Sequence, residues 1–250
     1  MDEGYWDKVA GDYDGEIFSV LGNDREEVIG SRIREFGSKQ GTACDFGCGV
    51  GKFLPILSKN FAHVYAVDLS SKLLSQAREN CEKLKNVSYI KEDLSEGGVK
   101  LEKVDFALSV SVAIMPSAEK RSGIFKTITK HLRKGGHLLL IVPSLESALY
   151  TDFRLVQWNM RSGWTVDEAV SELEEAGEEG ASLRQGLVEI EGVPTKHYLQ
   201  EELLAMFEGG ALDIVSIDKV EYSWKTEFDG PPRWMSEPYP WDWMVVFRKT

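Results

Sequence analysis

Hydrophobic and polar positions change their spacing in a regular way along the first 143 residues. Short apolar runs of strand length occur at 42–46, 63–68, 87–90, 104–110 and 137–142. Between them, apolar residues recur every three or four positions at 24–37, 53–60, 70–84 and 118–133, with Gly135 and Gly136 expected to stop the last helix. Apolar strands separated by helices predict a parallel sheet that is covered on both faces.

The pattern changes after Pro143. Residues 144–196 show helical spacing and no convincing strand, and Thr165 with Glu168 forms a capping box that opens one helix. A helix at 197–211 and strands at 212–224 and 241–249 follow. We expect one α/β domain, residues 1–250, with a doubly wound, mostly parallel seven-stranded sheet and a helical insertion. Its parts are an N-terminal lid and helix (1–40), a core (41–143), the insertion (144–196) and the rest of the sheet (197–250).

Composition narrows the partners. The chain has 250 residues, 42% of them hydrophobic, and a net charge of -12. An acidic surface repels nucleic-acid backbones, so we expect no nucleic-acid partner. No apolar run approaches the ~18 residues of a membrane span, so we expect no membrane partner. The acidic N-terminus and only three cysteines (Cys44, Cys48, Cys81) favour a reduced, cytoplasmic setting. The sequence leaves the oligomeric state open.

The segment CDFGCGVGKFL at 44–54 carries the candidate chemistry. A Walker phosphate loop requires a glycine where Phe46 stands and a hydroxyl where Phe53 stands. A dinucleotide fingerprint requires a third glycine where Lys52 stands. What remains is an acid, Asp45, that leads three glycines at alternate positions. A zinc site built on Cys44 and Cys48 lacks further ligands nearby in the sequence, so we expect no metal.

In its strand–turn–helix setting, this segment resembles motif I of the class I S-adenosylmethionine-dependent methyltransferases. DLSSKLLSQAREN, which begins at Asp68, Glu92-Asp93-Leu94 and KGGHLLLIVPS are similar to later family segments and follow in the family's order. The resemblance covers residues 41–143 well and 197–250 loosely. It implies a Rossmann-like fold with the last strand antiparallel. It also implies S-adenosyl-L-methionine as the cofactor and S-adenosyl-L-homocysteine as the product.

The resemblance also implies roles for single residues. Asp68 would accept both ribose hydroxyls, Leu69 would lie against adenine, and Asp93 would meet the adenine amino group. Tyr13 would reach the cofactor from the N-terminal segment. The cofactor-binding residues that we predict are Asp45, Gly47, Cys48, Gly49, Gly51, Asp68, Leu69, Asp93, Leu94, Ser109, Val110 and Tyr13.

Methyl transfer from a sulfonium requires alignment more than a dedicated catalytic group. His197 is the one weak candidate for a base, because the other three histidines fit structural or surface positions. The substrate-pocket residues that we predict come from three segments that reach the carboxyl ends of the strands: Tyr5, Trp6, Tyr150, Phe153, Trp158, Trp164, His197 and Trp234. The alternative is that the aromatic residues of 144–196 only pack the insertion.

The sequence thus predicts a methyltransferase that acts on an oxygen, nitrogen or other nucleophile of a small, partly apolar molecule. The [DN]PP[YFW] motif of exocyclic-amine nucleic-acid enzymes is missing after the fourth strand. Two alternatives stay open: a protein or peptide methyltransferase, and a cofactor-binding protein without catalysis. A nicotinamide enzyme is disfavoured because the glycine spacing is wrong.

Overall fold

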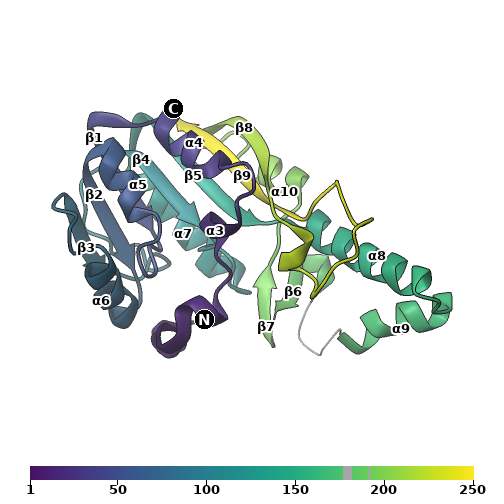
Figure 1. Cartoon of the computed structure of the whole chain (residues 1–250). Coiled ribbons are helices and arrows are strands. Elements are labelled where there is room, and N and C mark those ends of the chain that lie inside the picture. Colours follow the sequence, from purple (N-terminus) through teal and green to yellow (C-terminus); the bar gives the residue numbers. More distant parts are fainter. Residues whose placement is uncertain (177–181, 191) are drawn as a thin grey trace.

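A twisted sheet with helices on both faces forms the centre of the molecule (Figure 1). The computed structural model describes residues 1–176, 182–190 and 192–250. The seven strands lie in the order β3-β2-β1-β4-β5-β9-β8. Pairing is parallel from β3 to β5, whereas β9 runs antiparallel to both of its neighbours. The fold class expected from the sequence is therefore confirmed. The strand bounds are β1 Ser38–Phe46, β2 Phe61–Asp68, β3 Val87–Lys91, β4 Val104–Val110, β5 Leu132–Pro143, β8 Leu212–Glu221 and β9 Trp241–Lys249.

Two buried clusters show which helices cover which face. Helices α4 (Val28–Glu35), α5 (Leu54–Asn60) and α6 (Ser71–Asn80) pack on one face of the sheet, and α7 (Ala118–His131) and α10 (Gln200–Met206) pack on the other. Because side chains alternate along a strand, each sheet face contributes every second residue to its own cluster. Asp45, Asp68 and Ser109 lie near the carboxyl ends of buried strands, and all three are themselves buried.

The predicted end of the helix at 118–133 is wrong. Helix α7 ends at His131, and Gly135 and Gly136 lie within β5. Gly135 has φ +79°, and a Cβ on Gly136 would lie 2.8 Å from the carbonyl oxygen of Asp105. These glycines allow β5 to pack closely against β4. In the sequence, such a pair of glycines looks the same as a pair that ends a helix.

The N-terminal segment is helical and docks on α6. It contains α1 (Glu3–Val9), a 3₁₀ turn η1 (Ala10–Asp12), α2 (Tyr13–Glu16) and α3 (Val20–Asn23). The Ser70 hydroxyl donates to the Asp7 carboxylate at 2.5 Å. The Gln76 amide donates to the carbonyl of Ala10 at 2.6 Å. These bonds hold the first helix beside the end of β2, as a covering element for that edge of the sheet.

The insertion is only partly helical, which corrects the sequence prediction. Helices α8 (Leu145–Arg161) and α9 (Val166–Ala176) and a 3₁₀ turn η2 (Leu183–Gln185) precede a separate hairpin, β6 (Leu187–Ile190) and β7 (Val193–Lys196). The hairpin forms because β-branched residues flank Gly192, which has φ +76°. The Thr165–Glu168 capping box is confirmed by reciprocal hydrogen bonds. Residues 177–181 and 191 of the predicted insertion lie outside the described residues.

The insertion extends away from the sheet (Figure 1). A long loop joins β8 to β9 and begins with the 3₁₀ turn η3 (Trp224–Thr226). This loop lies beside α8 in space (Figure 1). Within the described residues, no helix is both long and apolar enough to cross a membrane.

Candidate functional site

The turn after β1 requires glycine at three positions. Gly47, Gly49 and Gly51 have φ values of +79°, +52° and +85°, a region that side chains rarely adopt. A Cβ on Gly47 would lie 2.3 Å from a methyl carbon of Val112, and one on Gly49 would lie 2.6 Å from the Tyr13 hydroxyl. The turn is tied to β2, because the amides of Gly47 and Cys48 both donate to the Val67 carbonyl. Both conformation and space therefore exclude side chains here.

Two buried carboxyl groups lie beside this turn. Asp68 accepts hydrogen bonds from the amide of Gly49 at 2.8 Å and from the amide of Ser70 at 2.9 Å. Asp45 is 2% exposed, and its Oδ2 atom has no hydrogen-bond partner among the residues that the structure describes. Burial, followed by the negative charge of Asp68, raises the pKa of Asp45 to about 8. Burial also raises the pKa of Asp68, although the backbone amides oppose that rise.

These features fit a positively charged nucleoside. A buried carboxyl oxygen without a partner is costly unless a ligand supplies a donor or a positive charge. S-adenosylmethionine carries both an ammonium and a sulfonium group, and its ribose carries hydroxyl donors. A turn without side chains lets such a ligand approach the backbone. Asp45 and Asp68 would hold it, and it would supply an electrophilic methyl group.

The cysteine of the turn has a structural role. Cys48 is buried, and its thiol contacts the Gly49 carbonyl at 3.7 Å. Burial raises the pKa of this thiol well above its ordinary value, so it is not a ready nucleophile. Cys48 lies in the turn, and its contact with the cofactor through the backbone stays a prediction.

The predicted adenine contacts lie in the turn after β3. The Asp93 carboxylate accepts hydrogen bonds from the amide and the hydroxyl of Ser95, at 2.8 and 2.7 Å. Leu94 is buried and its carbonyl accepts the Thr127 hydroxyl, while Leu69 at the end of β2 is half-buried. Asp93 thus caps a turn, and its contact with adenine stays a prediction.

The last predicted cofactor residues lie at the end of β4. Ser109 is fully buried, and its hydroxyl lacks a hydrogen-bond partner in the described part of the chain. Val110 is half-buried beside it. The unpaired hydroxyl is a second buried polar atom close to the carboxyl edge of the sheet.

The N-terminal segment lies directly over the glycine turn. Trp6 and Tyr13 pack against a small cluster formed by Ala10, Val50 and Leu73. The Lys52 ammonium lies 5.5 Å from the centre of the Tyr13 ring. Tyr5 contacts Trp6 edge-on, with 5.1 Å between the ring centres. The structure therefore brings Tyr13 to the predicted cofactor site, whereas Tyr5 packs against Trp6.

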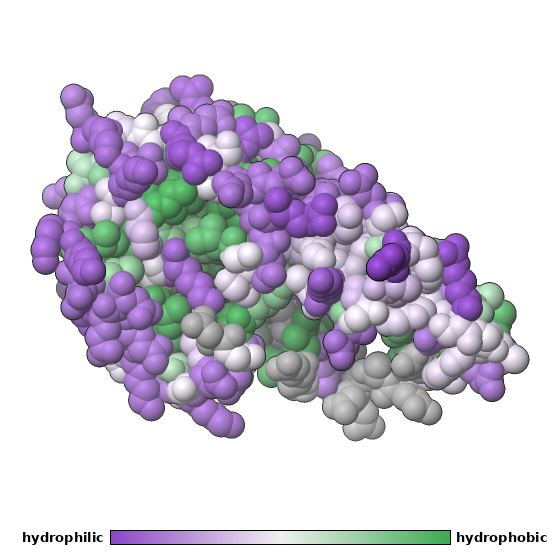
Figure 2. Space-filling view, viewed as in Figure 1, coloured by the Kyte–Doolittle hydropathy of each residue, from purple (hydrophilic) through white to green (hydrophobic). Residues whose placement is uncertain are grey.

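The aromatic residues of the insertion do not form a single wall. Tyr150 lies near Trp224 and Trp241, with ring centres 5.7 and 6.3 Å apart. Phe153 and Trp164 are 57% and 47% exposed, so the structure does not enclose them in a pocket. Figure 2 shows apolar surface in the hollow between the sheet and the insertion.

Two further predicted pocket residues make contacts within the insertion and its covering loop. Trp158 packs edge-on against Phe228, with the ring centres 5.8 Å apart. The Trp234 ring contacts the guanidinium groups of Arg154 and Arg161, at 5.2 and 4.0 Å from its centre. For these residues, the contacts support the alternative interpretation, in which they pack the insertion and do not line a substrate pocket.

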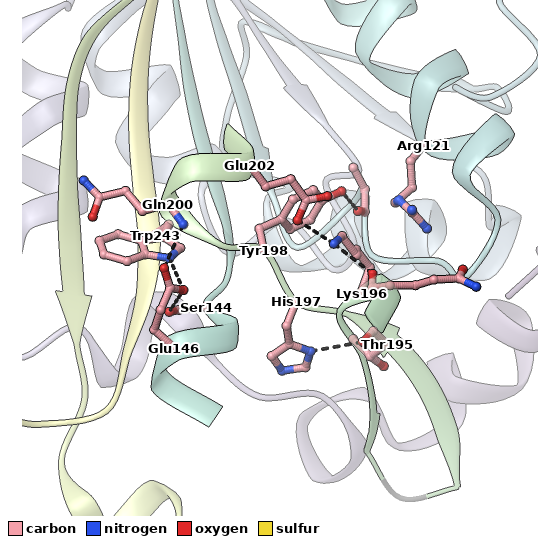
Figure 3. Close-up of polar contacts among 12 residues, drawn as sticks. Arg121, Ser144, Glu146, Thr195, Lys196, His197, Tyr198, Gln200, Glu202 and Trp243 are labelled. Atoms are coloured by element: carbon pink, nitrogen blue, oxygen red, sulfur yellow. Dashed lines mark hydrogen bonds and ion pairs between the residues drawn. The ribbon is translucent and has the colours of Figure 1, made fainter. Parts of the chain in front are cut away.

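A buried polar cluster ties the hairpin to the sheet (Figure 3). Lys196 is 2% exposed, and its ammonium donates to the Glu202 carboxylate at 2.6 Å and to the Gln185 carbonyl at 3.0 Å. The Tyr198 hydroxyl donates to the Ala113 carbonyl at 2.5 Å. Nothing in the residue pattern predicted this cluster, because its members come from separate segments.

His197 lies within the same cluster. It is 6% exposed, and Nδ1 donates to the carbonyl of Thr195 at 3.0 Å. Burial lowers its pKa, so the ring is neutral near pH 7. A neutral imidazole can accept a proton at Nε2, so a role as base stays a prediction.

The start of α8 is a second junction. Glu146 accepts hydrogen bonds from the amide of Gln200 and the indole of Trp243, at 2.8 and 3.1 Å (Figure 3). The Ser147 hydroxyl accepts the amide of Trp241 at 2.7 Å. The start of the insertion is therefore bonded to both α10 and β9.

The sequence also missed a carboxyl–phenol pair at the far end of this edge. The Tyr222 hydroxyl donates to Oδ2 of Asp242 at 2.7 Å. Burial, opposed by this bond and assisted by the charge of Glu227, raises the pKa of Asp242 to about 6. The available signal was a single acid in the otherwise apolar start of the last strand, WDWMVV.

Fold and site together define a class of protein. The strand order, the antiparallel β9 and the glycine turn with two acids are those of the class I S-adenosylmethionine-dependent methyltransferase fold. Residues 43–136 match the family model described as "Methyltransferase domain". S-adenosylmethionine is the methyl donor of this class.

Particular relatives are distant. The chain is 24% identical over 150 residues to phosphoethanolamine N-methyltransferase 1 of Triticum aestivum, a match that covers 56% of this chain and 30% of that relative. Two of the solved structures that share the fold illustrate this distance. One is the N-methyltransferase NodS from Bradyrhizobium japonicum with S-adenosyl-L-homocysteine, with 11% identity, 99% and 97% coverage and a TM-score of 0.63. The other is magnesium protoporphyrin IX methyltransferase from Synechocystis PCC 6803, with 14% identity, 99% and 98% coverage and a TM-score of 0.63.

Proposed function

We propose that this chain transfers the methyl group of S-adenosylmethionine to an oxygen, nitrogen or other nucleophile of a small, partly apolar molecule. The observation that carries the proposal is the glycine turn with its two buried acids, one of which has an oxygen without a partner in the described structure. Such a site suits a cationic nucleoside and does not suit a phosphate loop.

The chain's own residues would bind and align the reactants. Asp68 holds the turn through the Gly49 amide and would share its carboxylate with the ribose. Asp45 would ionise when a positive charge arrives, because an opposite charge favours the carboxylate. Tyr13 covers the turn and would exclude water from the reacting atoms.

A small acceptor is supported by the way in which the site is covered. The N-terminal segment lies over the cofactor end of the edge, and the insertion is bonded to the other end. The names of the Triticum aestivum relative and of the Synechocystis neighbour are those of enzymes that act on small molecules. The chain's acidic surface gives no support to a nucleic-acid acceptor.

The test is a transfer assay with S-adenosylmethionine that carries a labelled methyl group. A small-molecule extract and a protein extract are offered separately, and the Asp68→Ala variant is the control. We expect label in the small-molecule fraction with the native chain only. Label in proteins alone would support a protein methyltransferase. Tight cofactor binding without transfer to either fraction would support a non-catalytic protein.

A further inference from the structure

We propose that Asp242, oriented by Tyr222, accepts the proton that the acceptor loses during methyl transfer. This inference rests on the proposed function and adds a catalytic residue to it. The family match ends at residue 136, before both of these residues.

The sheet register places Asp242 on the ligand side of the edge. Asp45 pairs with Leu108, which pairs with Leu139, which pairs with Val246. Asp242 lies four residues before Val246 on the antiparallel strand, beyond the level of Asp45 in the direction of the carboxyl edge. Because side chains alternate, Asp242 and Asp45 lie on the same face of the sheet.

The separation leaves room for an acceptor. Strands β4 and β5 lie between β1 and β9, and neighbouring strands are about 4.8 Å apart, so β1 and β9 are about 14 Å apart across the sheet. The four-residue offset along β9 adds to the distance between the two acids. The bound cofactor would occupy the part of this space next to the glycine turn. A small acceptor would fit between it and Asp242.

The N-terminal segment covers both ends of this space. Tyr13 lies over Gly49, and the Phe18 ring lies edge-on to the Tyr222 ring, with 4.9 Å between the ring centres. The six residues from Tyr13 to Phe18 therefore bridge the cofactor end and the Tyr222 end. A space under one continuous segment is suited to a reaction that excludes water.

Asp242 has the surroundings of a proton acceptor. The residue as a whole is half-buried, and desolvation by the surrounding protein raises the pKa of its carboxyl. The hydrogen bond from Tyr222 fixes Oδ2, so Oδ1 would be the oxygen that meets the methyl acceptor. The charged groups that face this pair are Glu227 beside Asp242 and Asp24 beside Tyr222.

The step balances. The acceptor's lone pair forms a bond to the methyl carbon, the carbon–sulfur bond breaks, and its electron pair stays on sulfur. The proton of the acceptor N–H or O–H passes to the Asp242 carboxylate, which later releases it to water. No oxidant, reductant or further co-reactant is needed.

The experiment compares Asp242→Asn and Tyr222→Phe with Asp213→Asn, an exposed acid at the opposite end of the β8–β9 pair. Turnover is measured with the acceptor that takes label in the small-molecule assay, and S-adenosyl-L-homocysteine binding is measured by calorimetry. We expect Asp242→Asn to lower kcat by about 10²–10³-fold. Its affinity for S-adenosyl-L-homocysteine should stay within about threefold of that of the native chain. Asp213→Asn should match the native chain in both.

The pH profile separates catalysis from folding support. In the native chain, kcat should rise with pH through about 6 as Asp242 ionises, because only the carboxylate can accept a proton. This rise should be absent in Asp242→Asn and shifted in Tyr222→Phe. An infrared carboxyl band that titrates near pH 6, and that Asp242→Asn removes, would identify the group without turnover.

Three results would overturn the inference, and they differ from one another. Native-like kcat and an unchanged pH profile in Asp242→Asn would exclude Asp242 while leaving the proposed function intact. A native chain that labels no small molecule would end the proposed function, and the inference with it. Loss of S-adenosyl-L-homocysteine binding in Asp242→Asn would assign this residue to folding support instead.

Discussion

The two ends of the sheet edge are built in different ways. At the glycine turn, backbone conformation forms the site, and consecutive residues of one loop supply it. At the end formed by β5, β9 and β8, side chains from the N-terminal segment, the insertion and the last loop meet. The first end tolerates almost no substitution, whereas the second can change one side chain at a time. This difference fits an enzyme that binds its methyl donor at the glycine turn and its methyl acceptor at the other end.

The largest effect is expected at the first end. Gly47→Ala should abolish measurable S-adenosyl-L-homocysteine binding and lower the free energy of unfolding by more than about 2 kcal/mol, because the new Cβ meets Val112 and φ is positive. Urea unfolding and calorimetry measure both.

The matched control is Gly209→Ala, where φ is +67° and nothing lies within 4 Å of the added carbon. It should cost only about 1 kcal/mol, from backbone strain alone. Equal effects at the two glycines would show that crowding at the turn does not matter.

The next effect concerns the attachment of the insertion. Lys196→Ala should lower the free energy of unfolding by about 2 kcal/mol, because it leaves Glu202 without its buried partner. The Glu202 side chain is 33% exposed, which keeps the cost below that of a fully buried pair. A double variant with Glu202→Gln should recover part of the loss. An additive double variant would mean that the pair does not couple the hairpin to α10.

A pH-dependent effect is expected at Asp45. Its pKa is about 8 in the folded chain and near 3.8 when unfolded, so the folded state holds a proton that the unfolded state releases. The free energy of unfolding of the ligand-free chain should therefore fall as pH rises from about 4 to 8. Asp45→Asn cannot ionise and should be more stable than the native chain at pH 8, by at least about 1 kcal/mol. Parallel pH curves for the two proteins would contradict the assignment.

The smallest effect is expected at the exposed tip of the insertion. Trp164→Ala should change the free energy of unfolding by less than about 0.5 kcal/mol, because the side chain is 47% exposed. The acceptor KM should also change less than threefold. A large rise in KM would return Trp164 to the pocket in which the sequence placed it.

The difference between the two ends also explains what the sequence could predict. The glycine turn, Asp68 and the strand order follow from local patterns, because neighbouring residues in the chain form them. The β6–β7 hairpin was missed because its two strands are only four residues each. Glu146 joins segments far apart in the chain. The Lys196–Glu202 and Tyr222–Asp242 pairs each join two different elements, and residue spacing in one sequence carries no signal of such pairing.

Trp164 and Phe153 show the same limit in reverse. Their residue type is typical of a pocket, yet the structure leaves them on the surface of α8 and the turn that follows it. Whether an aromatic residue faces a ligand, a core or solvent depends on how the insertion folds back, which composition does not determine.

The central claim is that the buried acids of the glycine turn bind S-adenosylmethionine, and calorimetry of the native chain and Asp68→Ala tests it most directly. Asp68 orients the Gly49 amide and would hold the ribose, so the account predicts saturable binding to the native chain. It predicts an affinity at least about tenfold weaker in the variant, as expected for the loss of charged hydrogen bonds. Undiminished affinity in a folded Asp68→Ala variant would contradict it.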